Sequence, residues 1–580
     1  MKRIKSDTCI EIENNFKIEA GPGAGKTTWL INHIKQVLTT SKRLGVGKKI
    51  ACITYTNNAV NEIKERLNEG TGKVEVDTIH GFLYRNIIKP YGYLLKDDNG
   101  KCLINLDELS GHQEHIPYRN FLRLLLERYT ERKNNEKNYI FYLKNEKFIE
   151  YIKKFDWIQN EQGEFEYKVN SLNKRMIFQN KLPSFNKEEI EEYKMNYWKI
   201  GVLHHEDVLY LSYKILKENN RIVDFLNKKF PYIFIDEFQD THPIQAMIIK
   251  MLTNDKTRIG IIGDSAQAIY EFNGTDRRQF TEFNVDNLKV YTIKENNRSG
   301  KSIVGFLNIL RNDFEQQPIK LNSGEVRILV GDKFKIVEKI RNEENAIILV
   351  RNNSDVNELE FNESLIDNLW EKAIAIDSNE KRVNTLYTIL KSIQLYNFQS
   401  YTEARKEISK ILKRRKNEKK LSKWDKRKIA IDILDKVAKS FEEYKNQGII
   451  DFNNEVVKNI EDIYNLGKMT SIITSKSKRL VDFYKEYKVI DFYQSLKIND
   501  SQGYIRTIHS AKGSEFNSVL VIMDEKQKKY LFNFDLEKEE HRIFYVAFSR
   551  AKEKLFINVP ILNESEAEYL IKRNIDIQYI

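Results

Sequence analysis

The sequence predicts an α/β fold with two parallel-sheet cores, each interrupted by a long helical insertion. Apolar runs typical of buried strands alternate with segments of helical periodicity at the start of the chain. This alternation stops near residue 88, resumes near residue 199 and stops again between residues 370 and 497. Both interruptions are too long for one crossover between parallel strands, so we interpret each as an insertion into a sheet domain.

A Gly-rich turn joins the first strand to the first helix. In FKIEAGPGAGKTTWLINHI, residues 16–34, the strand ends at Ala20 and the helical pattern begins at Lys26. Backbone N–H groups of such a turn bind phosphate oxygens, Lys26 can reach the β- and γ-phosphates, and the Thr27 hydroxyl can ligate Mg²⁺. An ordinary Gly-rich turn is the alternative, which the strand, loop and helix context disfavours. The expected nucleotide-binding residues are Ala20, Gly21, Gly23, Ala24, Gly25, Lys26, Thr27 and Thr28.

The other strands of the first core follow in order along the chain. A strand from about Lys48 leads into a helix near Asn57, and strong strand patterns return at YIFIDEF and RIGIIGD. The segment between them is rich in Lys, Glu, Asn and aromatic residues with helical periodicity. We expect residues 1–88 and 199–290 to form the first core and residues 89–198 its helical insertion.

The second core, like the first, is predicted from strand patterns that a helical insertion interrupts. Strand patterns at NAIILVRNNSD and YIRTIHSAKGSEFNSVLVI place it at residues 291–369 and 498–580, with a helical insertion at residues 370–497. This insertion contains the basic segment ILKRRKNEKKLSKWDKRKIA, residues 411–430. A surface that contacts phosphates and a solvated helix face are both open interpretations of this segment.

Composition restricts the class of protein and its partners. The 580 residues carry a formal charge of +12, which favours a polyanionic partner, although a composition rich in Lys, Asn and Ile explains the charge equally well. The three cysteines match neither a disulfide framework nor a metal cluster, and no long apolar run is present. We expect a cytoplasmic protein without a membrane segment.

Two adjacent acids end the strand in FIDEFQD, residues 234–240. Ligands of open parallel sheets bind at the carboxyl ends of the strands, so these acids are expected to face the phosphate loop. We assign Asp236 to Mg²⁺ and Glu237 to the attacking water. The alternative is an acid pair that caps the next helix.

Further motifs follow in a fixed order along the chain. In order they read AGPGAGKTT, TYTNNA, VDTIHGF, DEFQD, GDSAQAIYEFNG, NNRS, TIHSAKGSEF and YVAFSRAK. With these motifs the chain resembles a superfamily 1 helicase of the UvrD/PcrA/Rep type over nearly its whole length. The resemblance implies two RecA-like P-loop cores, ATP and Mg²⁺ as cofactors, single-stranded or partly duplex DNA as the partner, and 3′-to-5′ polarity.

The resemblance also implies roles for individual residues. Gln267 would sense the γ-phosphate, Arg298 and Arg550 would reach the nucleotide from the second core, Glu515 would contact the ribose, and Gln239 would link nucleotide to DNA. Aromatic rings stack on bases without reading sequence, although each aromatic taken singly is more often part of a core. The residues expected to face DNA are Tyr55, Asn57, His80, Phe82, Tyr270, Phe272 and His509.

Several positions depart from the family pattern. Ala20 stands where the phosphate loop usually has Gly, the first glutamine after the N-terminus is Gln36, and Asn297 replaces the tyrosine that usually stacks on adenine. Asn273 replaces a common arginine. These features, with the short segment after Arg550, resemble the helicase-like subunit of the Gabija anti-phage system, which works beside an OLD-family nuclease.

Two other functions remain open from sequence. The first is a housekeeping DNA-repair helicase. The second is a DNA-stimulated NTPase that acts as a sensor or regulatory subunit with little unwinding. His204 and His205, with Glu206 and Asp207, are assigned no metal, because consecutive helical residues cannot all face one ion.

We predict weak discrimination between ATP and GTP. Neither an upstream glutamine nor a tyrosine at position 297 is present to read the base, while the residues that contact phosphates are complete. Competition kinetics should therefore give similar kcat/KM values for the two nucleotides. A preference above about a hundredfold, or roughly 2.7 kcal/mol, would show that another residue reads the base.

Overall fold

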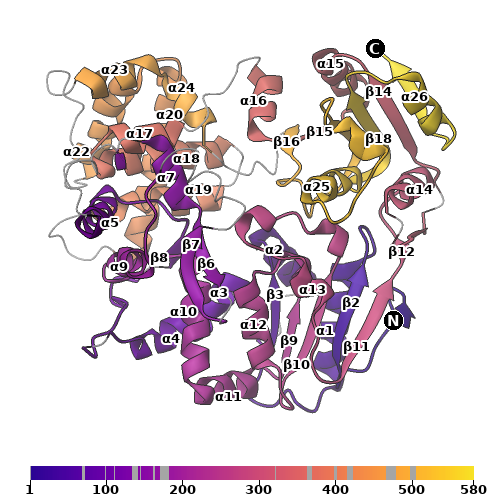
Figure 1. The fold of residues 1–580 in the computed structure, drawn as a ribbon, viewed down its shortest axis with the longest axis horizontal. Coiled ribbons are helices and arrows are strands. Elements are labelled where there is room, and N and C mark those ends of the chain that lie inside the picture. The colour runs from indigo at the N-terminus through magenta and orange to yellow at the C-terminus, as the bar shows by residue number, and fades with distance from the viewer. Residues whose placement is uncertain are drawn as a thin grey trace.

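The computed structural model contains two sheet domains and two insertions (Figure 1). The two sheets lie on one side of the molecule and the two insertions lie together on the other, where Lys153 and Glu371 form an ion pair of 2.7 Å. The structure describes residues 2–67, 72–97, 99–109, 111–133, 142–143, 145–160, 163–169, 182–311, 313–320, 322–361, 369–397, 401–414, 422–464, 478–496 and 504–580.

The first core is a seven-stranded parallel sheet in the order β1-β11-β2-β10-β9-β3-β4. The central strands are buried on both faces, as the apolar runs predict. The strands are β1 (Lys2–Ile4), β2 (Asn15–Ala20), β3 (Ile50–Thr54), β4 (Val74–Thr78), β9 (Tyr232–Ile235), β10 (Arg258–Gly263) and β11 (Leu288–Ile293). The helices of this core are α1 (Lys26–Thr40), α2 (Asn57–Leu67), α10 (His205–Glu218), α11 (Asn220–Lys229), α12 (Pro243–Leu252) and α13 (Arg278–Thr281).

The boundary predicted after residue 290 is wrong, because it divides β11. This strand pairs with β2 from Leu288 to Ile293, and its other edge pairs with β1. The first core therefore extends to Ile293, and the chain crosses to the second core at β12 (Glu295–Asn296), which pairs with β13 (Gln317–Pro318).

The first insertion is not helical throughout, contrary to the prediction. It contains the antiparallel hairpin of β6 (Phe155–Gln159) and β7 (Phe165–Val169), whose buried residues alternate as in a half-buried strand. A shorter parallel pair joins β5 (His112–Gln113) to β8 (Leu203–His204). Between β4 and the insertion lie α3 (Ile79–Leu83) and the π-helical turn Tyr84–Ile88, and the helices of the insertion are α4 (Lys89–Tyr91), α5 (Arg119–Arg132), α7 (Glu146–Lys153) and α9 (Lys187–Trp198).

The second core is a six-stranded parallel sheet in the order β16-β15-β17-β18-β14-β19. Together the two sheets confirm the predicted α/β architecture. The strands are β14 (Glu325–Val330), β15 (Ile347–Val350), β16 (Ile505–Thr507), β17 (Phe516–Ile522), β18 (Ala551–Val559) and β19 (Asp576–Tyr579). The helices are α14 (Lys301–Leu310), α15 (Lys333–Glu344), α16 (Asn353–Phe361), α25 (Glu539–Phe548) and α26 (Glu564–Ile571).

The second insertion has a hydrophobic core of its own. Its helices are α17 (Leu369–Ile376), α18 (Glu380–Asn397), α19 (Tyr401–Ile408), α20 (Lys423–Tyr444), α21 (Ile449–Asp451), α22 (Lys458–Tyr464), α23 (Lys478–Glu486) and α24 (Val489–Gln494). Of the basic segment, residues 415–421 lie outside the described residues, and Lys426, Arg427 and Lys428 are exposed on α20. Among the described helices, none is long and apolar enough to span a bilayer.

A buried lysine fixes the centre of the first insertion. His204, Glu206 and Asp207 converge, with one possible ligand atom from each lying within 4.8 Å of the others. From the sequence we did not expect them to converge, because neighbouring residues of a helix point in different directions. The Lys194 ammonium lies among them, donating to His204 Nδ1 at 2.9 Å, Glu206 Oε1 at 2.9 Å and Asp207 Oδ1 at 2.8 Å. The cluster therefore already contains a cation of its own.

We predict that Lys194→Met destabilises the protein. Lys194 and Asp207 are both 0% exposed, so the substitution leaves a buried carboxylate without its cation, at a cost of about 3–5 kcal/mol. Calorimetry should show a lower unfolding temperature. Lys199→Met, at an exposed position just after the same helix, is the control and should change stability by no more than about 0.5 kcal/mol. Equal unfolding temperatures for the two variants would contradict the prediction.

Candidate nucleotide and DNA site

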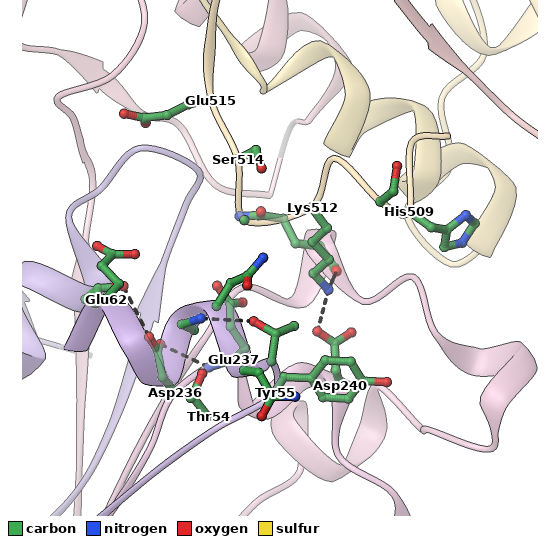
Figure 2. A pocket seen from close by; sticks show the side chains of 18 of the residues that line it. Thr54, Tyr55, Glu62, Asp236, Glu237, Asp240, His509, Lys512, Ser514 and Glu515 are labelled. Atoms are coloured by element: carbon green, nitrogen blue, oxygen red, sulfur yellow. Dashed lines mark hydrogen bonds and ion pairs between the residues drawn. The ribbon is translucent and has the colours of Figure 1, made fainter. Parts of the chain in front are cut away.

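A cleft lies between the two cores and is lined by both (Figure 2). The first core contributes the phosphate loop and the acids after β9, and the second core contributes residues from the loops before β17 and β18. The predicted residues that line it include Gly23, Ala24, Gly25, Lys26, Thr27, Thr28, Asp236, Glu237, Gln267, Arg298, Glu515 and Arg550. The structure thus brings together residues that are more than five hundred positions apart in the chain.

The phosphate loop has the backbone that anion binding requires. It connects β2, which ends at Ala20, to α1, which begins at Lys26, and Gly23 and Gly25 adopt φ values of 68° and 80°. No side chain caps the N-terminus of α1, so its first N–H groups remain available to phosphate oxygens. The second core touches this loop, because the Asn297 N–H donates to the Gly23 carbonyl at 2.8 Å.

Thr27 and Asp236 form a donor set that suits Mg²⁺. The Thr27 hydroxyl lies 3.3 Å from Asp236 Oδ2, and both groups face the cleft beside Lys26. Hydroxyl and carboxylate oxygens are the protein ligands that Mg²⁺ takes in nucleotide sites. Burial and the neighbouring Glu237 raise the pKa of Asp236, and a bound dication would favour the ionised form instead.

Glu237 has a strained backbone and an ionised side chain. Its φ and ψ of 55° and 40° are left-handed, which is unusual for a residue with a side chain and is typical of functional sites. Burial opposes ionisation, but Lys26 and Lys512 outweigh it and lower the pKa of Glu237. Gln239 donates to this carboxylate. Glu237 is therefore placed and charged as a general base requires.

Arg550 crosses from the second core to the first. Its Nη2 donates to Gln267 Oε1 at 2.8 Å, and burial together with the like charge of Arg298 lowers its pKa to about 9. Arg298 instead donates to Glu515 at 2.7 Å and to the Ser549 carbonyl at 3.0 Å. In this structure Arg298 and Glu515 are thus paired with each other at the mouth of the cleft.

Lys512 is a site residue that motif reasoning did not single out. Its ammonium pairs with Asp240, donates to the Gln267 carbonyl at 2.6 Å and lies 4.7 Å from the centre of the Tyr270 ring. Figure 2 shows Lys512 reaching from the second core to Asp240. The sequence offered one signal for this residue, since Lys512 is the only lysine within the motif TIHSAKGSEF.

Aromatic residues continue the cleft away from the phosphate loop. Tyr55 and Tyr270 stack at 4.9 Å with their planes 21° apart, and Phe272 contacts His509 edge to face at 5.2 Å. Phe272 is 58% exposed, and Asn57 is exposed at the start of α2. These residues form a connected surface on which bases can stack.

Two predicted DNA contacts have different surroundings. Phe82 is 1% exposed and packs against Phe230 in the core, so its ring cannot stack on a base, and the prediction for this residue is wrong. His80 lines the cleft region next to Tyr55 and lies close to two other histidine rings, His112 at 5.7 Å and His205 at 5.5 Å. Burial and these histidines lower the pKa of His80, so its ring is neutral at pH 7.

Comparisons with known proteins agree with this geometry. The UvrD/REP helicase N-terminal domain matches residues 2–287, and the UvrD-like helicase C-terminal domain matches residues 301–560. The chain is 25% identical to the ATP-dependent DNA helicase Rep of Buchnera aphidicola, over 94% of this chain and 93% of that protein. It is 22% identical to the Gabija protein GajB of Bacillus cereus, over 97% and 96%. The ATP-dependent DNA helicase PcrA of Bacillus subtilis is 25% identical over 52% and 38%.

We predict that Lys26→Ala and Glu237→Gln both abolish nucleotide hydrolysis, by different routes. Lys26→Ala removes a cation that binds phosphate, so nucleotide affinity should fall. Glu237→Gln removes the base and keeps the phosphate loop intact, so nucleotide should still bind. Equilibrium binding of a fluorescent ATP analogue and single-turnover hydrolysis separate the two effects. Near-normal hydrolysis by Glu237→Gln would refute the assignment.

Proposed function

The chain belongs to the UvrD-like helicase family, and we propose that it couples ATP hydrolysis to 3′-to-5′ movement along single-stranded DNA. The observation that carries this proposal is the Lys512 side chain. It touches Asp240 and the Gln267 carbonyl on the nucleotide side and Tyr270 on the aromatic side. A change at the phosphates therefore has a direct route to the surface proposed to hold bases.

Hydrolysis uses groups from both cores. In the proposed reaction the phosphate loop and Lys26 bind the triphosphate, and Thr27 and Asp236 hold Mg²⁺, which neutralises phosphate charge when bound. Glu237 accepts the proton of the attacking water. Arg550 donates to the γ-phosphoryl oxygens as negative charge develops on them. Once phosphate leaves, this bridge between the cores is lost and the cleft opens.

Opening and closing would move the DNA. Tyr55 and Tyr270 lie on the first core, whereas His509 lies on the second, so parting of the cores separates Tyr270 from His509, now 5.9 Å apart. Bases released by one group and captured by the next would advance in steps. Net charge of +12 favours the DNA partner.

The cellular role that we propose is anti-phage defence beside a nuclease of the OLD family. Its support is the similarity to Gabija protein GajB over nearly the whole of both chains. A DNA-repair helicase and a DNA-stimulated NTPase sensor are the competing roles. Co-purification with the nuclease from the neighbouring reading frame tests the partner, and a strand-displacement assay beside phosphate release separates unwinding from hydrolysis alone.

We predict that the wild-type protein displaces streptavidin from the 5′ end of biotinylated single-stranded DNA and leaves a 3′-end block in place. Arg550→Ala should bind DNA and ATP yet fail to displace either block, because it removes the contact across the cleft without touching the main site of either ligand. Preferential clearing of the 3′ end by the wild type would refute the polarity. Clearing of the 5′ end by Arg550→Ala would refute the mechanism of cleft closure.

A further inference from the structure

Arg311 is a buried arginine that joins the two cores and takes no part in the hydrolytic chemistry. It follows α14 of the second core and is 1% exposed. Its Nη1 donates to Asp264 Oδ1 at 2.7 Å, and Asp264, directly after β10 of the first core, is 0% exposed. A buried ion pair therefore links the two sheets.

The second core holds the Arg311 guanidinium in place. Its Nε donates to Asp313 Oδ1 at 2.9 Å, and the guanidinium lies 4.6 Å from the centre of the Phe314 ring. Glu19, on β2, lies 3.6 Å from Nη2. Asp313 and Phe314 hold the guanidinium on the second core, whereas Glu19 is a partner on the first core, so a movement of the second core carries the cation away from Glu19.

Asp264 in turn fixes the amide of Gln267. Asp264 Oδ2 accepts a bond of 2.6 Å from Gln267 Nε2, and Oδ1 accepts from the Ala266 N–H at 3.1 Å. The Asp264 N–H donates to Gln239 Oε1 at 3.0 Å. Asp264 is thus bonded to Gln267 and also to Gln239, which in turn donates to the Glu237 carboxylate.

The orientation of Gln267 follows from these bonds. With Nε2 held by Asp264, Oε1 is the atom that faces Arg550 at 2.8 Å. The series Arg311, Asp264, Gln267, Arg550 therefore begins and ends on the second core and passes through the first. Charge-assisted hydrogen bonds of this kind are strong and directional, and networks of them act as a unit.

We propose that Arg311 is a positioning residue that makes the orientation of Gln267 depend on closure of the two cores. In the closed arrangement Arg311 fixes Asp264, and Asp264 holds Gln267 Nε2 so that Gln267 Oε1 faces Arg550 in the cleft. When the cores part, Asp264 loses its cation and Gln267 loses its fixed orientation. This inference rests on the proposed function, because it assigns Gln267 a role in hydrolysis.

The test measures DNA-stimulated ATP hydrolysis by Arg311→Gln and Arg311→Lys. We expect Arg311→Gln to lower kcat by roughly 10- to 100-fold, as misplacement of a catalytic group does, with KM for ATP changed less than about threefold. Arg311→Lys keeps the charge and should recover part of kcat. The double variant Arg311→Met/Asp264→Asn removes both charges, should fold, and should show the same low kcat.

A second measurement asks whether Arg311 acts through Gln267. Adding Arg311→Gln to Gln267→Ala should lower kcat no further, because the group that Arg311 positions is already absent. Arg382→Gln is the matched control. Arg382 forms a buried pair with Asp377, with bonds of 2.7 and 2.6 Å, entirely within the second insertion. Its loss should lower the unfolding temperature and leave kcat unchanged.

The outcomes separate this inference from the proposed function. A wild-type protein without DNA-stimulated hydrolysis would overturn the proposed function. An active wild type with a normal kcat in Arg311→Gln would overturn the role of Arg311 alone. A loss of kcat in Arg311→Gln that adds to the loss in Gln267→Ala would also overturn it, because Arg311 would then act independently of Gln267. An equal loss of kcat in Arg382→Gln would overturn it too, because the effect would then be merely structural.

Discussion

The contact between the Arg550 guanidinium and the Gln267 amide is the interaction on which the rest of the structure depends. Each residue comes from a different sheet, so the contact exists only while the two cores are closed on each other. The first sheet places the carboxyl-terminal ends of its strands at the shared cleft, which is where open parallel sheets bind ligands. The second sheet contributes the loops that lead into β17 and β18. The fold therefore makes a nucleotide site from two halves, neither of which is complete alone.

Charge compensation explains how buried acids are tolerated where the two cores meet. Three buried acids of the first core, Asp236, Asp240 and Asp264, need compensation, because an unpaired buried carboxylate is costly. The second core supplies Lys512 to Asp240 and Arg311 to Asp264, while Lys26 of the first core lies beside Asp236. Contact between the cores therefore gives these acids their cations, and separation of the cores exposes both partners to water.

The sequence predicted the parts of the fold that local patterns determine. Buried parallel strands read as apolar runs, so the two sheets were predicted correctly. Lys26 and Glu237 stand at fixed places within their motifs, and the structure brings both to one cleft. The β6–β7 hairpin was missed, because its alternation lies within an aromatic-rich segment of helical character. Phe82 shows that a motif does not reveal which way a side chain points. The role of Arg311 could not be predicted from motifs, because its partner Asp264 is distant in sequence and only the tertiary structure brings the two side chains together.

The second insertion has a hydrophobic core of its own and also takes part in the cleft. Its apolar residues pack together, while side chains of α18 and α19, among them Lys391, line the cleft. The aromatic surface is tied to the cleft as well, because Tyr270 stacks on Tyr55 and lies under Lys512, which also pairs with Asp240. Phosphate chemistry and aromatic stacking therefore share one cation. A movement of Lys512 on one side therefore changes its contacts on the other, and in the proposed function this shared contact couples hydrolysis to DNA movement.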